Sequence, residues 1–406
     1  MDRGYIVKAK KIVTVGKDKT IVNGAMVIKE GKIIDIGKVE DIISKYKELE
    51  IEDFGDLVIT PSLIDCHTHL LEYAPSTVYP VTNETYNIAQ KSLVLQALMS
   101  GVTTFGEQIC GSPMTVSSVK DFKDIAKELP VNMVFSCNSI TIGFKDLVNF
   151  TSVTGNNSVS KDKLIEDDTI MNLIENSDYP GENIFINATP ANLTEDIVPR
   201  AGEVIYTQEE LDKIVSIFHD KGKRIGCHVA GNDAIEMAIK ARFDVIHHGH
   251  GITDNEINDV SNNKISIVAT PLGGTHLKSN SPEEILKLIE NKILVAIATD
   301  AYLPPYEGVS WLRFNDKEPK GSPELMIISN EAMKLLLDNG YDENEALSLI
   351  TLNAAKILGV EDKVGSLETG KDADFIVSNG IPGIEFTNNS NIKRVYLKGR
   401  CLISRI

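Results

Sequence analysis

The stretch that decides the fold is residues 245–298: Val245-Ile246, Thr253-Asp-Asn-Glu256, Ile265-Ser-Ile-Val-Ala269, Ser281-Pro-Glu-Glu284 and Leu294-Val-Ala-Ile-Ala298. The three short apolar runs suit strands buried on both faces. The two polar segments between them fit capping boxes, the second with proline at the first helical position. Strand and helix therefore alternate here, which predicts a parallel sheet built from βα units.

The same alternation extends toward the N-terminus. Four further apolar runs of this kind are Val102–Phe105, Met133–Ser136, Ile184–Ile186 and Arg224–Cys227. A fifth predicted strand ends near Asp65. Thr207-Gln-Glu-Glu210 marks another helix start. The count reaches eight units, which predicts a (β/α)8 TIM-type barrel whose functional groups lie at the C-terminal strand ends. A doubly wound open sheet is the alternative, but no GxGxxG motif opens any of the helices.

Both ends of the chain are rich in short strands. Residues 25–37 turn at Glu30-Gly31 and residues 394–403 turn at Lys398-Gly399, as hairpins do. We expect the two ends to pair into one small β-sandwich domain; two separate sheet fragments are the alternative.

The predicted domain boundaries follow from these patterns. Residues 1–58 and 359–406 would form the β-sandwich domain, and residues 59–358 the barrel. An Asn-rich and Ser-rich stretch near 145–182 interrupts the alternation of strands and helices. It is either an insertion that acts as a lid or shapes the substrate site, or a disordered segment.

Composition narrows the class of protein. Of 406 residues, 42% are hydrophobic and 24% charged, which excludes wholesale disorder. The 41 basic and 58 acidic side chains leave a net charge of −17, which argues against nucleic acid and membrane surfaces as partners. No apolar run reaches the roughly 18 residues of a membrane span, and the N-terminus lacks a signal-peptide core. Five scattered cysteines without a CxxC pair indicate reduced thiols, so we expect a cytoplasmic protein.

A histidine pair follows the first predicted barrel strand, in Pro61-Ser-Leu-Ile-Asp-Cys-His-Thr-His-Leu70. His67 and His69 are two residues apart, so on a strand both rings project to the same face and can bind one cation. Such a pair also occurs by chance on surface strands.

Three further candidates follow other predicted strands. His228 follows Arg224–Cys227, His248 follows Val245-Ile246, and Asp300 follows the run that starts at Leu294. A TIM-type barrel would bring these strand ends together. Histidines with a carboxylate suit zinc, iron or manganese. Alone, each of these residues has a structural explanation: a histidine can be buried in the core, and an aspartate can cap a helix. Chance does not explain such residues at four strand ends.

These segments resemble the amidohydrolase superfamily of metal-dependent hydrolases, in its imidazolonepropionase-like and prolidase-like branches. The segments that carry the resemblance are Asp65-Cys-His-Thr-His69, Cys227-His-Val-Ala-Gly231, Asp244-Val-Ile-His-His-Gly249, Ala298-Thr-Asp-Ala301 and Gly365-Ser-Leu-Glu-Thr-Gly-Lys-Asp-Ala-Asp374. The resemblance covers nearly the whole chain and is weakest over residues 106–206.

The resemblance implies a set of ligands and roles. His67, His69, His228 and Asp300 would bind a divalent metal, zinc first, with iron or manganese as alternatives. His248 would bind a second ion or stabilise the oxyanion of the substrate. Asp300 would take a proton from metal-activated water and pass it to the leaving nitrogen, which makes Asp300 and His248 the implied catalytic residues.

Two departures from the family pattern bear on metal number and activity. The fourth-strand segment Asn183-Ile-Phe-Ile-Asn-Ala-Thr-Pro190 has no lysine where many two-metal relatives carry a carboxylated one, so one ion is favoured over two. Glu107 is a possible bridge between two ions, and Cys137 is a weaker candidate for that role. The alternative for Glu107 is a carboxylate that supports the site from behind or faces solvent. Val229-Ala-Gly231 supplies no histidine or glutamate after the fifth strand, which argues against a cytosine-deaminase-like enzyme.

Four other residues have less defined roles. His250 has the strand parity of the candidate ligand two residues before it and is a possible substrate contact, whereas His247 should point away, into the layer between barrel and helices. Tyr302 and His276 are further possible substrate contacts; an exposed loop histidine is the alternative for His276.

The expected function is that of a metal-dependent amidohydrolase. It would hydrolyse a C–N bond other than an ordinary peptide bond, in a small cyclic amide of the imidazolone type or a related amide. Alternatives on the same barrel are a heterocycle deaminase and a prolidase-like dipeptidase, and an alternative of another class is a catalytically silent scaffold. The expected partner is a small-molecule substrate, and a homo-oligomer is possible.

Overall fold

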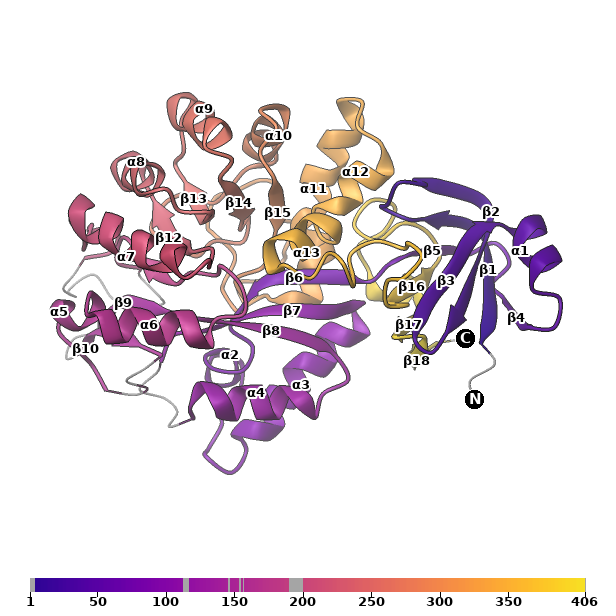
Figure 1. The fold of residues 1–406 in the computed structure, drawn as a ribbon, viewed down its shortest axis with the longest axis horizontal. Coiled ribbons are helices and arrows are strands. Elements are labelled where there is room, and N and C mark those ends of the chain that lie inside the picture. The colour runs from indigo at the N-terminus through magenta and orange to yellow at the C-terminus, as the bar shows by residue number, and fades with distance from the viewer. Residues whose placement is uncertain are drawn as a thin grey trace.

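The computed structural model describes residues 4–111, 117–144, 147–152, 155, 157–189 and 200–405. Within these residues the strands form three hydrogen-bonded sheets. Figure 1 shows two of the sheets in the middle of the molecule, surrounded by helices, and the third at one side, where both chain ends lie.

One sheet is built from both ends of the chain. Its strands are β1 (Tyr5–Val13), β2 (Thr20–Lys29), β3 (Lys32–Lys38), β4 (Glu50–Asp53), β5 (Val58–Pro61), β16 (Phe375–Ser378), β17 (Ile392–Leu397) and β18 (Arg400–Ser404). The strand order is β18-β17-β16-β5-β1-β2-β3, with β4 beside β1, so β5 and β16 join the two ends. The rings of Phe375 and Tyr396 stack in its buried core, 4.2 Å apart. The domain boundaries themselves stay a prediction.

The two hairpin turns lie where the sequence predicts them. Glu30 and Gly31 connect β2 and β3, and Lys398 and Gly399 connect β17 and β18. All four residues have positive φ, between 47° and 78°. Two-residue hairpin loops with this conformation match the twist of the strands, and glycine adopts it without strain.

The strands of the other two sheets occupy the middle of the chain. They are β6 (Leu63–Thr68), β7 (Val102–Ile109), β8 (Asn132–Cys137), β9 (Ser139–Phe144), β10 (Leu147–Thr151), β11 (Ile184–Phe185), β12 (Gly226–Ala230), β13 (Val245–His250), β14 (Ser266–Ala269) and β15 (Val295–Ile297). β6-β7-β8 form one parallel sheet, and β9-β11-β12-β13-β14-β15 run parallel in the other, with β10 antiparallel to β9.

Backbone hydrogen bonds connect the two sheets at one edge. The N–H of Asp300 donates to His67 O (3.0 Å) and the N–H of His69 donates to Ala301 O (3.1 Å), which joins the segment after β15 to β6. At the other edge, β8 continues into β9 through Asn138, whose N–H donates to Ile109 O at the end of β7 (2.8 Å). The first of these connections lies at the predicted ligands and holds them together.

Helices follow most of the parallel strands. They are α2 (Ala74–Val78), α3 (Tyr86–Met99), α4 (Val119–Lys127), α5 (Lys161–Leu164), α6 (Asp167–Asn176), α7 (Gln208–Asp220), α8 (Asn232–Ala241), α9 (Asp254–Asn262), α10 (Pro282–Glu290), α11 (Leu325–Asp338), α12 (Glu343–Ser348) and α13 (Leu352–Leu358); α1 (Val39–Lys45) belongs to the sheet of the chain ends. Each of the longer ones buries an apolar side, such as Ile214 and Phe218 of α7, in one continuous core with the strands.

The predicted helix starts are confirmed, with one difference in detail. Thr207, Thr253 and Ser281 are the N-caps of α7, α9 and α10. At α10 only half of the expected box forms: Ser281 Oγ accepts from the N–H of Glu284 (3.1 Å), but the Glu284 carboxylate accepts from Asn280 Nδ2 instead. The reason is that Asn280 is buried and needs an acceptor for its amide.

The stretch predicted as an insertion contains regular elements. β10 pairs with β9, and α6 packs against β8 as the helix of a βα unit does. Residues 145–146, 153–154 and 156 of this stretch lie outside the described residues. The part of the stretch that departs from the βα rhythm is therefore the β9–β10 pair and the segment that follows it.

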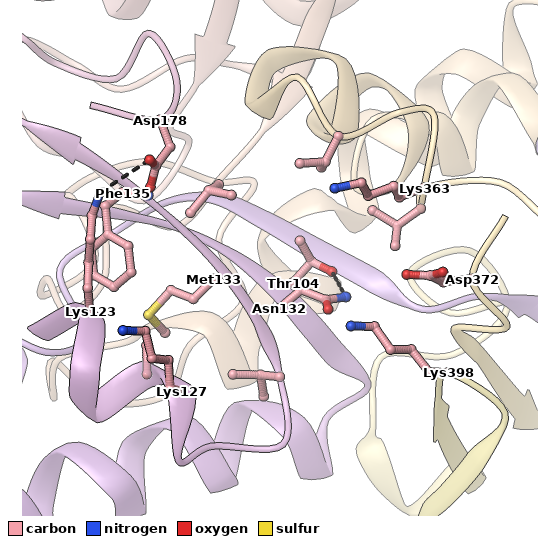
Figure 2. Close-up of a pocket in the computed structure, with 15 residues that line it drawn as sticks. Thr104, Lys123, Lys127, Asn132, Met133, Phe135, Asp178, Lys363, Asp372 and Lys398 are labelled. Atoms are coloured by element: carbon pink, nitrogen blue, oxygen red, sulfur yellow. Dashed lines mark hydrogen bonds and ion pairs between the residues drawn. The ribbon is translucent and has the colours of Figure 1, made fainter. Parts of the chain in front are cut away.

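A cavity of about 460 Å3 lies near the N-terminal ends of β7 and β8. Figure 2 shows Lys123 and Lys127 of α4 on one side of it and Lys363 and Lys398 on the other. None of the residues that line it is a predicted site residue. As for membranes, none of the helices in the described part of the chain has both the length and the apolar character to cross a bilayer.

Candidate metal centre

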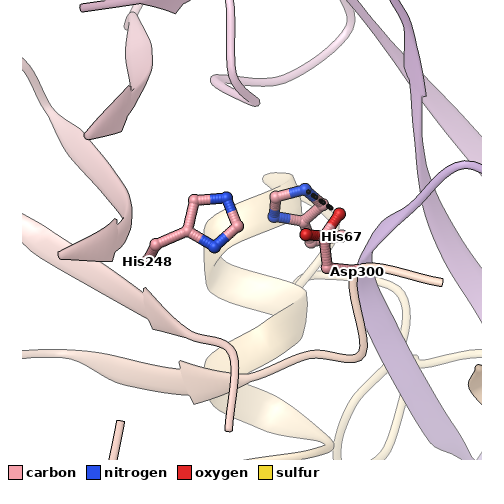
Figure 3. A group of neighbouring side chains, drawn as sticks. All are labelled: His67, His248 and Asp300. Carbon is pink, nitrogen blue, oxygen red and sulfur yellow. Dashed lines mark ion pairs between the residues drawn. The ribbon is translucent and has the colours of Figure 1, made fainter. Parts of the chain in front are cut away.

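Three of the predicted ligands meet at the joint between β6 and the segment after β15. Asp300 Oδ1 lies 3.2 Å from His67 Nε2 and 3.4 Å from His69 Nε2. Figure 3 shows Asp300 beside His67, with the ring of His248 opposite. His67 and Asp300 are buried, and the His69 side chain is 14% exposed. The prediction that residues far apart in the chain converge at the strand ends therefore describes this cluster.

Glu182, which the sequence analysis did not single out, lies at the centre of the cluster. Its Oε2 is 3.2 Å from His67 Nε2 and 3.8 Å from His69 Nε2. Its other oxygen, Oε1, accepts hydrogen bonds from His228 Nδ1 (2.8 Å) and His248 Nε2 (2.7 Å). One buried carboxylate thus joins the HxH pair to the histidines of β12 and β13.

The donor atoms fit a metal ion. Among the described residues, three overlapping triads have ligand atoms within 4.8 Å of one another: His67, His248 and Asp300; His67, His69 and Glu182; and Glu182, His228 and His248. A tetrahedron of ligands about 2.05 Å from zinc has edges of about 3.4 Å. The nitrogen–oxygen distances are comparable: Nε2 of His67 and Nε2 of His69 each lie 3.2 to 3.8 Å from the nearest oxygens of Glu182 and Asp300.

His67 Nε2 shows the fit most directly. It is completely buried and has no hydrogen bond of acceptable geometry, although two carboxylate oxygens lie 3.2 Å away. Buried polar atoms are almost always hydrogen-bonded. A nitrogen and two carboxylates that converge without hydrogen-bonding to one another are arranged as ligands around a cation.

The electrostatics of the cluster also favour a cation. Burial opposes charge on the His67 ring, but Glu182 and Asp300 more than offset it and raise the His67 pKa to about 10. Burial likewise opposes charge on Glu182, yet the rings of His67, His228 and His248 hold its pKa well below the usual range. The Asp300 pKa is also lowered, by His67 first. Both carboxylates therefore stay ionised and available to bind a metal.

Glu107 holds the HxH segment from behind. Its carboxylate accepts from the N–H groups of Leu70 (3.0 Å) and Leu71 (2.6 Å) and from Thr68 Oγ1 (2.8 Å). Burial raises its pKa to about 7, against the effect of these donors. Glu72 makes the reciprocal contacts with the N–H groups of Cys110 and Gly111. The Glu107 oxygens are thus occupied by donors of the protein itself, and the carboxylate between the histidines is Glu182. The role of Glu107 at the metal stays a prediction.

The expectation for His247 is wrong. Its ring is fully buried and its Nδ1 lies 3.0 Å from His67 Nδ1, inside the cluster rather than in the helix layer. His247 pairs with His228 before the register shifts, and it has the strand parity of Val245, whose side chain packs with Ile64 and Cys66 of β6, so regular alternation points His247 inward. The bulge comes one residue later, at His248 with φ of 69°, and turns the His248 ring toward the cluster as well.

The other predicted contacts lie around the cluster. His250 is buried behind His248, and its ring hydrogen-bonds to Thr270 Oγ1 and Thr275 Oγ1. Tyr302 is buried with no partner for its hydroxyl, and His276 is exposed. Cys137 is buried outside the three triads, and all five cysteines are free. Whether His250, Tyr302 or His276 contacts substrate stays a prediction.

Gly274 brings the backbone of the loop after β14 against the cluster. A Cβ at this position would lie 2.3 Å from Asp300 Oδ2 and 2.5 Å from His248 Cε1, and its φ is 116°. The carbonyl of Gly274 accepts from Thr189 Oγ1 (3.2 Å). Only glycine allows a backbone to approach the two side chains this closely.

Comparison with known proteins identifies the family. The model of the amidohydrolase family matches residues 58–402. The chain belongs to the amidohydrolase family. It is therefore a hydrolase, and the resemblance and the enzyme class predicted from the sequence are confirmed.

Three relatives show the range of this amidohydrolase's neighbours. A 5-methylthioadenosine/S-adenosylhomocysteine deaminase of Thermodesulfovibrio yellowstonii is 21% identical over 93% of this chain and 86% of the relative. An imidazolonepropionase of Pyrobaculum arsenaticum is 24% identical over 92% of each chain. The solved structure of a Xaa-Pro dipeptidase with bound methionine superposes with a TM-score of 0.72 at 20% identity, over 98% of this chain and 99% of the other. The family's structures imply a TIM-type barrel for the middle of this amidohydrolase.

Proposed function

We propose that this chain hydrolyses an amide C–N bond in a small molecule, with cyclic amides of the imidazolone type as the first substrate class. The observation that carries the proposal is the position of Glu182 between two sets of donor atoms. One set is His67, His69 and Asp300, and the other is His228 on β12 and His248 on β13. Retention of every predicted ligand in one buried cluster argues against a silent scaffold.

We propose a centre for two divalent ions, zinc first, which His67, His69 and Asp300 would hold on one side and His228 and His248 on the other, with Glu182 shared by both sets. The expectation of one ion rested on the absence of a fourth-strand lysine, and Glu182 would supply a carboxylate in place of that lysine. His228 Nδ1 and His248 Nε2 now donate to Glu182 Oε1, so a second ion would replace the two protons of these hydrogen bonds. Iron and manganese also suit the donor set.

A bound ion of this kind polarises a substrate carbonyl and lowers the pKa of water from 15.7 to about 7. The chain's own residues supply the proton transfers. Asp300, kept ionised by His67, accepts the proton of the attacking water and delivers it to the leaving nitrogen. Gly274 limits the movement of the Asp300 carboxylate, because the backbone lies against Oδ2.

Amide hydrolysis is favoured over deamination of a heterocycle. Residues 229–231 after His228 carry no acid that could shuttle a proton to a ring nitrogen. A paired centre that activates water and polarises a carbonyl matches the needs of an unactivated amide. Relatives named as imidazolonepropionases suggest a cyclic amide, and the similarity to a Xaa-Pro dipeptidase makes a dipeptide-like amide the second class.

The fold and setting of the proposed enzyme follow the sequence prediction. We propose that β6 to β15 close as a (β/α)8 barrel and that the sheet of the chain ends folds as a β-sandwich. The free thiols fit a reducing compartment such as the cytoplasm. The expected partner is a small molecule rather than nucleic acid or a membrane, given the net charge of −17.

The test is a substrate screen with metal analysis on the purified chain. Zinc-loaded protein is offered imidazolones, hydantoins and lactams, N-acyl amino acids, Xaa-Pro dipeptides and aminated heterocycles. Ring opening, free amine and ammonia are measured separately. Turnover of a cyclic or acyclic amide without ammonia release supports the proposal. Turnover confined to ammonia release overturns it in favour of a deaminase, and full turnover after complete chelation overturns the metal centre.

A further inference from the structure

His247 connects a ligand histidine to the backbone of the loop that carries Glu182. Its Nε2 lies 3.1 Å from Pro180 O, and its Nδ1 lies 3.0 Å from Nδ1 of His67. The rings of His247 and His67 meet edge to face, with centroids 4.8 Å apart. Both rings are fully buried. The contacts therefore form one buried chain from the Pro180 carbonyl through two imidazoles to the centre of the cluster.

The chain fixes where the protons lie. A carbonyl oxygen only accepts, so His247 Nε2 carries the hydrogen. The His247 ring is fully buried, and among the described residues its two nitrogens contact the Pro180 carbonyl and the His67 ring rather than a carboxylate, so the ring is neutral and its Nδ1 has a free lone pair. His67 Nδ1 must then donate to that lone pair. With its hydrogen held on Nδ1, His67 would give up the Nε2 proton to bind a metal, and the freed Nε2 lone pair would face Glu182 and Asp300.

We propose that His247 is a positioning residue that holds His67 in the one tautomer and ring orientation able to bind a metal through Nε2. The proposal rests on the proposed metal centre. Partners of this kind behind a metal-binding histidine are usually carboxylates or backbone carbonyls. Here the partner of His67 is a neutral histidine, His247, whose own hydrogen is held by the Pro180 carbonyl.

The surroundings explain how this arrangement is kept rigid. Pro180 lies two residues before Glu182, so His247 links two ligand-bearing segments, the end of β6 and the loop before β11. That loop packs tightly against β12: a Cβ at Gly226 would lie 2.0 Å from Gly181 O and 2.6 Å from Pro180 O. The acceptor carbonyl therefore cannot move away without displacing the strand.

Two substitutions separate hydrogen bonding from packing. In His247→Asn, the amide oxygen takes the place of Nδ1 and can still accept from His67. In His247→Leu, the volume is largely kept but the acceptor is lost, and His67 Nδ1–H is left buried without a partner. His219→Asn is the control, since His219 is 40% exposed and pairs with Asp244 on the surface.

The experiment measures zinc and cobalt dissociation constants by competition with a chelator, together with the histidine nitrogen NMR signals of zinc-loaded protein. We expect His247→Leu to weaken the binding of the tightest ion by about 10 to 100-fold, the range for loss of such a partner. It should also remove the protected Nδ1–H signal of His67. His247→Asn should stay within a few-fold of the wild type and keep the signal, and His219→Asn should change nothing. Unfolding midpoints show that the variants are folded.

The outcomes distinguish this inference from the proposed function. If the wild type binds no divalent ion, the metal centre is wrong. If the wild type binds zinc and His247→Leu binds it equally tightly with an unchanged His67 signal, the role of His247 is overturned while the metal centre stands. Equal losses in the Asn and Leu variants also overturn it, because they would show that ring packing rather than the acceptor matters.

Discussion

Glu182 lies two residues before β11, and this explains why the sequence did not reveal it. In a TIM-type barrel, functional residues are expected after the C-terminal ends of strands rather than before the strands. Glu182 precedes β11, a strand of only two residues, and ends a polar stretch that has no periodicity. Its position depends on the path of the loop from α6, which depends on tertiary packing. The spacing of residues in the sequence therefore does not predict where this loop places Glu182.

Neutralising Glu182 tests its role at the residue scale. Glu182→Gln keeps the size of the side chain but removes the charge shared by His67, His228 and His248. We expect at least half of the bound metal to be lost and kcat/KM to fall by at least about 100-fold, since even partners behind a ligand can contribute that much. Elemental analysis and kinetics are the measurements.

The matched control for this variant is Glu236→Gln. Glu236 lies on α8, is 57% exposed and pairs with Lys240. Metal content and activity should match the wild type. Full metal content in Glu182→Gln would show that the carboxylate is not a ligand.

Gly274 offers a second test at this scale. Gly274→Ala places a methyl group against Asp300 Oδ2 and His248 Cε1, so it should reduce kcat by about 100-fold or more through displacement of these groups by about 1 Å. Gly273→Ala is matched to it: φ is 147°, yet nothing lies within 4 Å of the added Cβ. The measurement is kcat of both variants by steady-state kinetics. Similar losses in both would indicate backbone strain rather than a clash at the site.

At the scale of elements, two reciprocal carboxylates fasten the ends of β6 and β7 to each other. Glu107, on β7, accepts from the amides after β6, and Glu72 accepts from the amides after β7. The sequence indicated Glu107 as important but could not distinguish a metal bridge from this role. Only the structure shows that its oxygens are already used by backbone donors.

Removing the Glu107 carboxylate should loosen the HxH segment. Glu107→Ala leaves the two buried amides of Leu70 and Leu71 without an acceptor, at about 1–3 kcal/mol for each unsatisfied group, whereas Thr68 Oγ1 can still donate to Gly106 O. We therefore expect a loss of about 3 kcal/mol in the free energy of unfolding and weaker metal retention. Glu107→Gln keeps one acceptor oxygen and should lose less. Denaturant titrations of metal-free and zinc-loaded protein measure both effects, and equal stability of the Ala variant would rule out the fastening role.

Elements were predicted best where the signal is local. The caps Thr207 and Thr253 and the turn at Lys398-Gly399 depend on contacts within four residues, so their sequence patterns specified them. His247 and His248 show the limit. Both rings face the cluster because a bulge interrupts the alternation at His248, and a bulge depends on register with the neighbouring strand, which strict alternation does not anticipate.

At the scale of the whole molecule, Asp374 lies where the sheet of the chain ends meets the parallel strands. Its carboxylate accepts from Asn132 Nδ2 on β8 (2.7 Å) and from the N–H of Lys398 (2.6 Å). Burial raises its pKa to about 6. Because the folded-state pKa lies above the unfolded value, the ionised form disfavours folding. The stability is full below pH 3.8 and is lost as pH rises through 6.

Asp374→Asn should remove this pH dependence. Relative to the wild type, the variant should gain stability between pH 4 and 7 by up to about 3 kcal/mol, the equivalent of a shift of about two pKa units. Asp56→Asn is the control, since the Asp56 side chain is 98% exposed. Unfolding midpoints across this pH range give the answer. A constant difference between variant and wild type would contradict the expectation.

Metal removal should weaken the entire fold, because the proposed ligands come from both sides of the joint between β6 and the segment after β15. Chelation is expected to lower the melting temperature by at least about 5 °C, and zinc should restore it. Scanning calorimetry before and after dialysis is the measurement. The Glu182→Gln variant should respond less. An unchanged melting temperature after verified metal loss would argue against a shared centre.

The pairing of β5 with β16 has a consequence for biosynthesis. β5 is complete once Pro61 has been translated, but its neighbour does not exist until Phe375 leaves the ribosome. At about 5–20 residues per second, that interval lasts roughly 15 to 60 s. Throughout it, an open strand edge faces other nascent polypeptides and invites mispairing. Chaperone protection during synthesis would therefore matter more for this chain than for one whose neighbouring strands are made in succession.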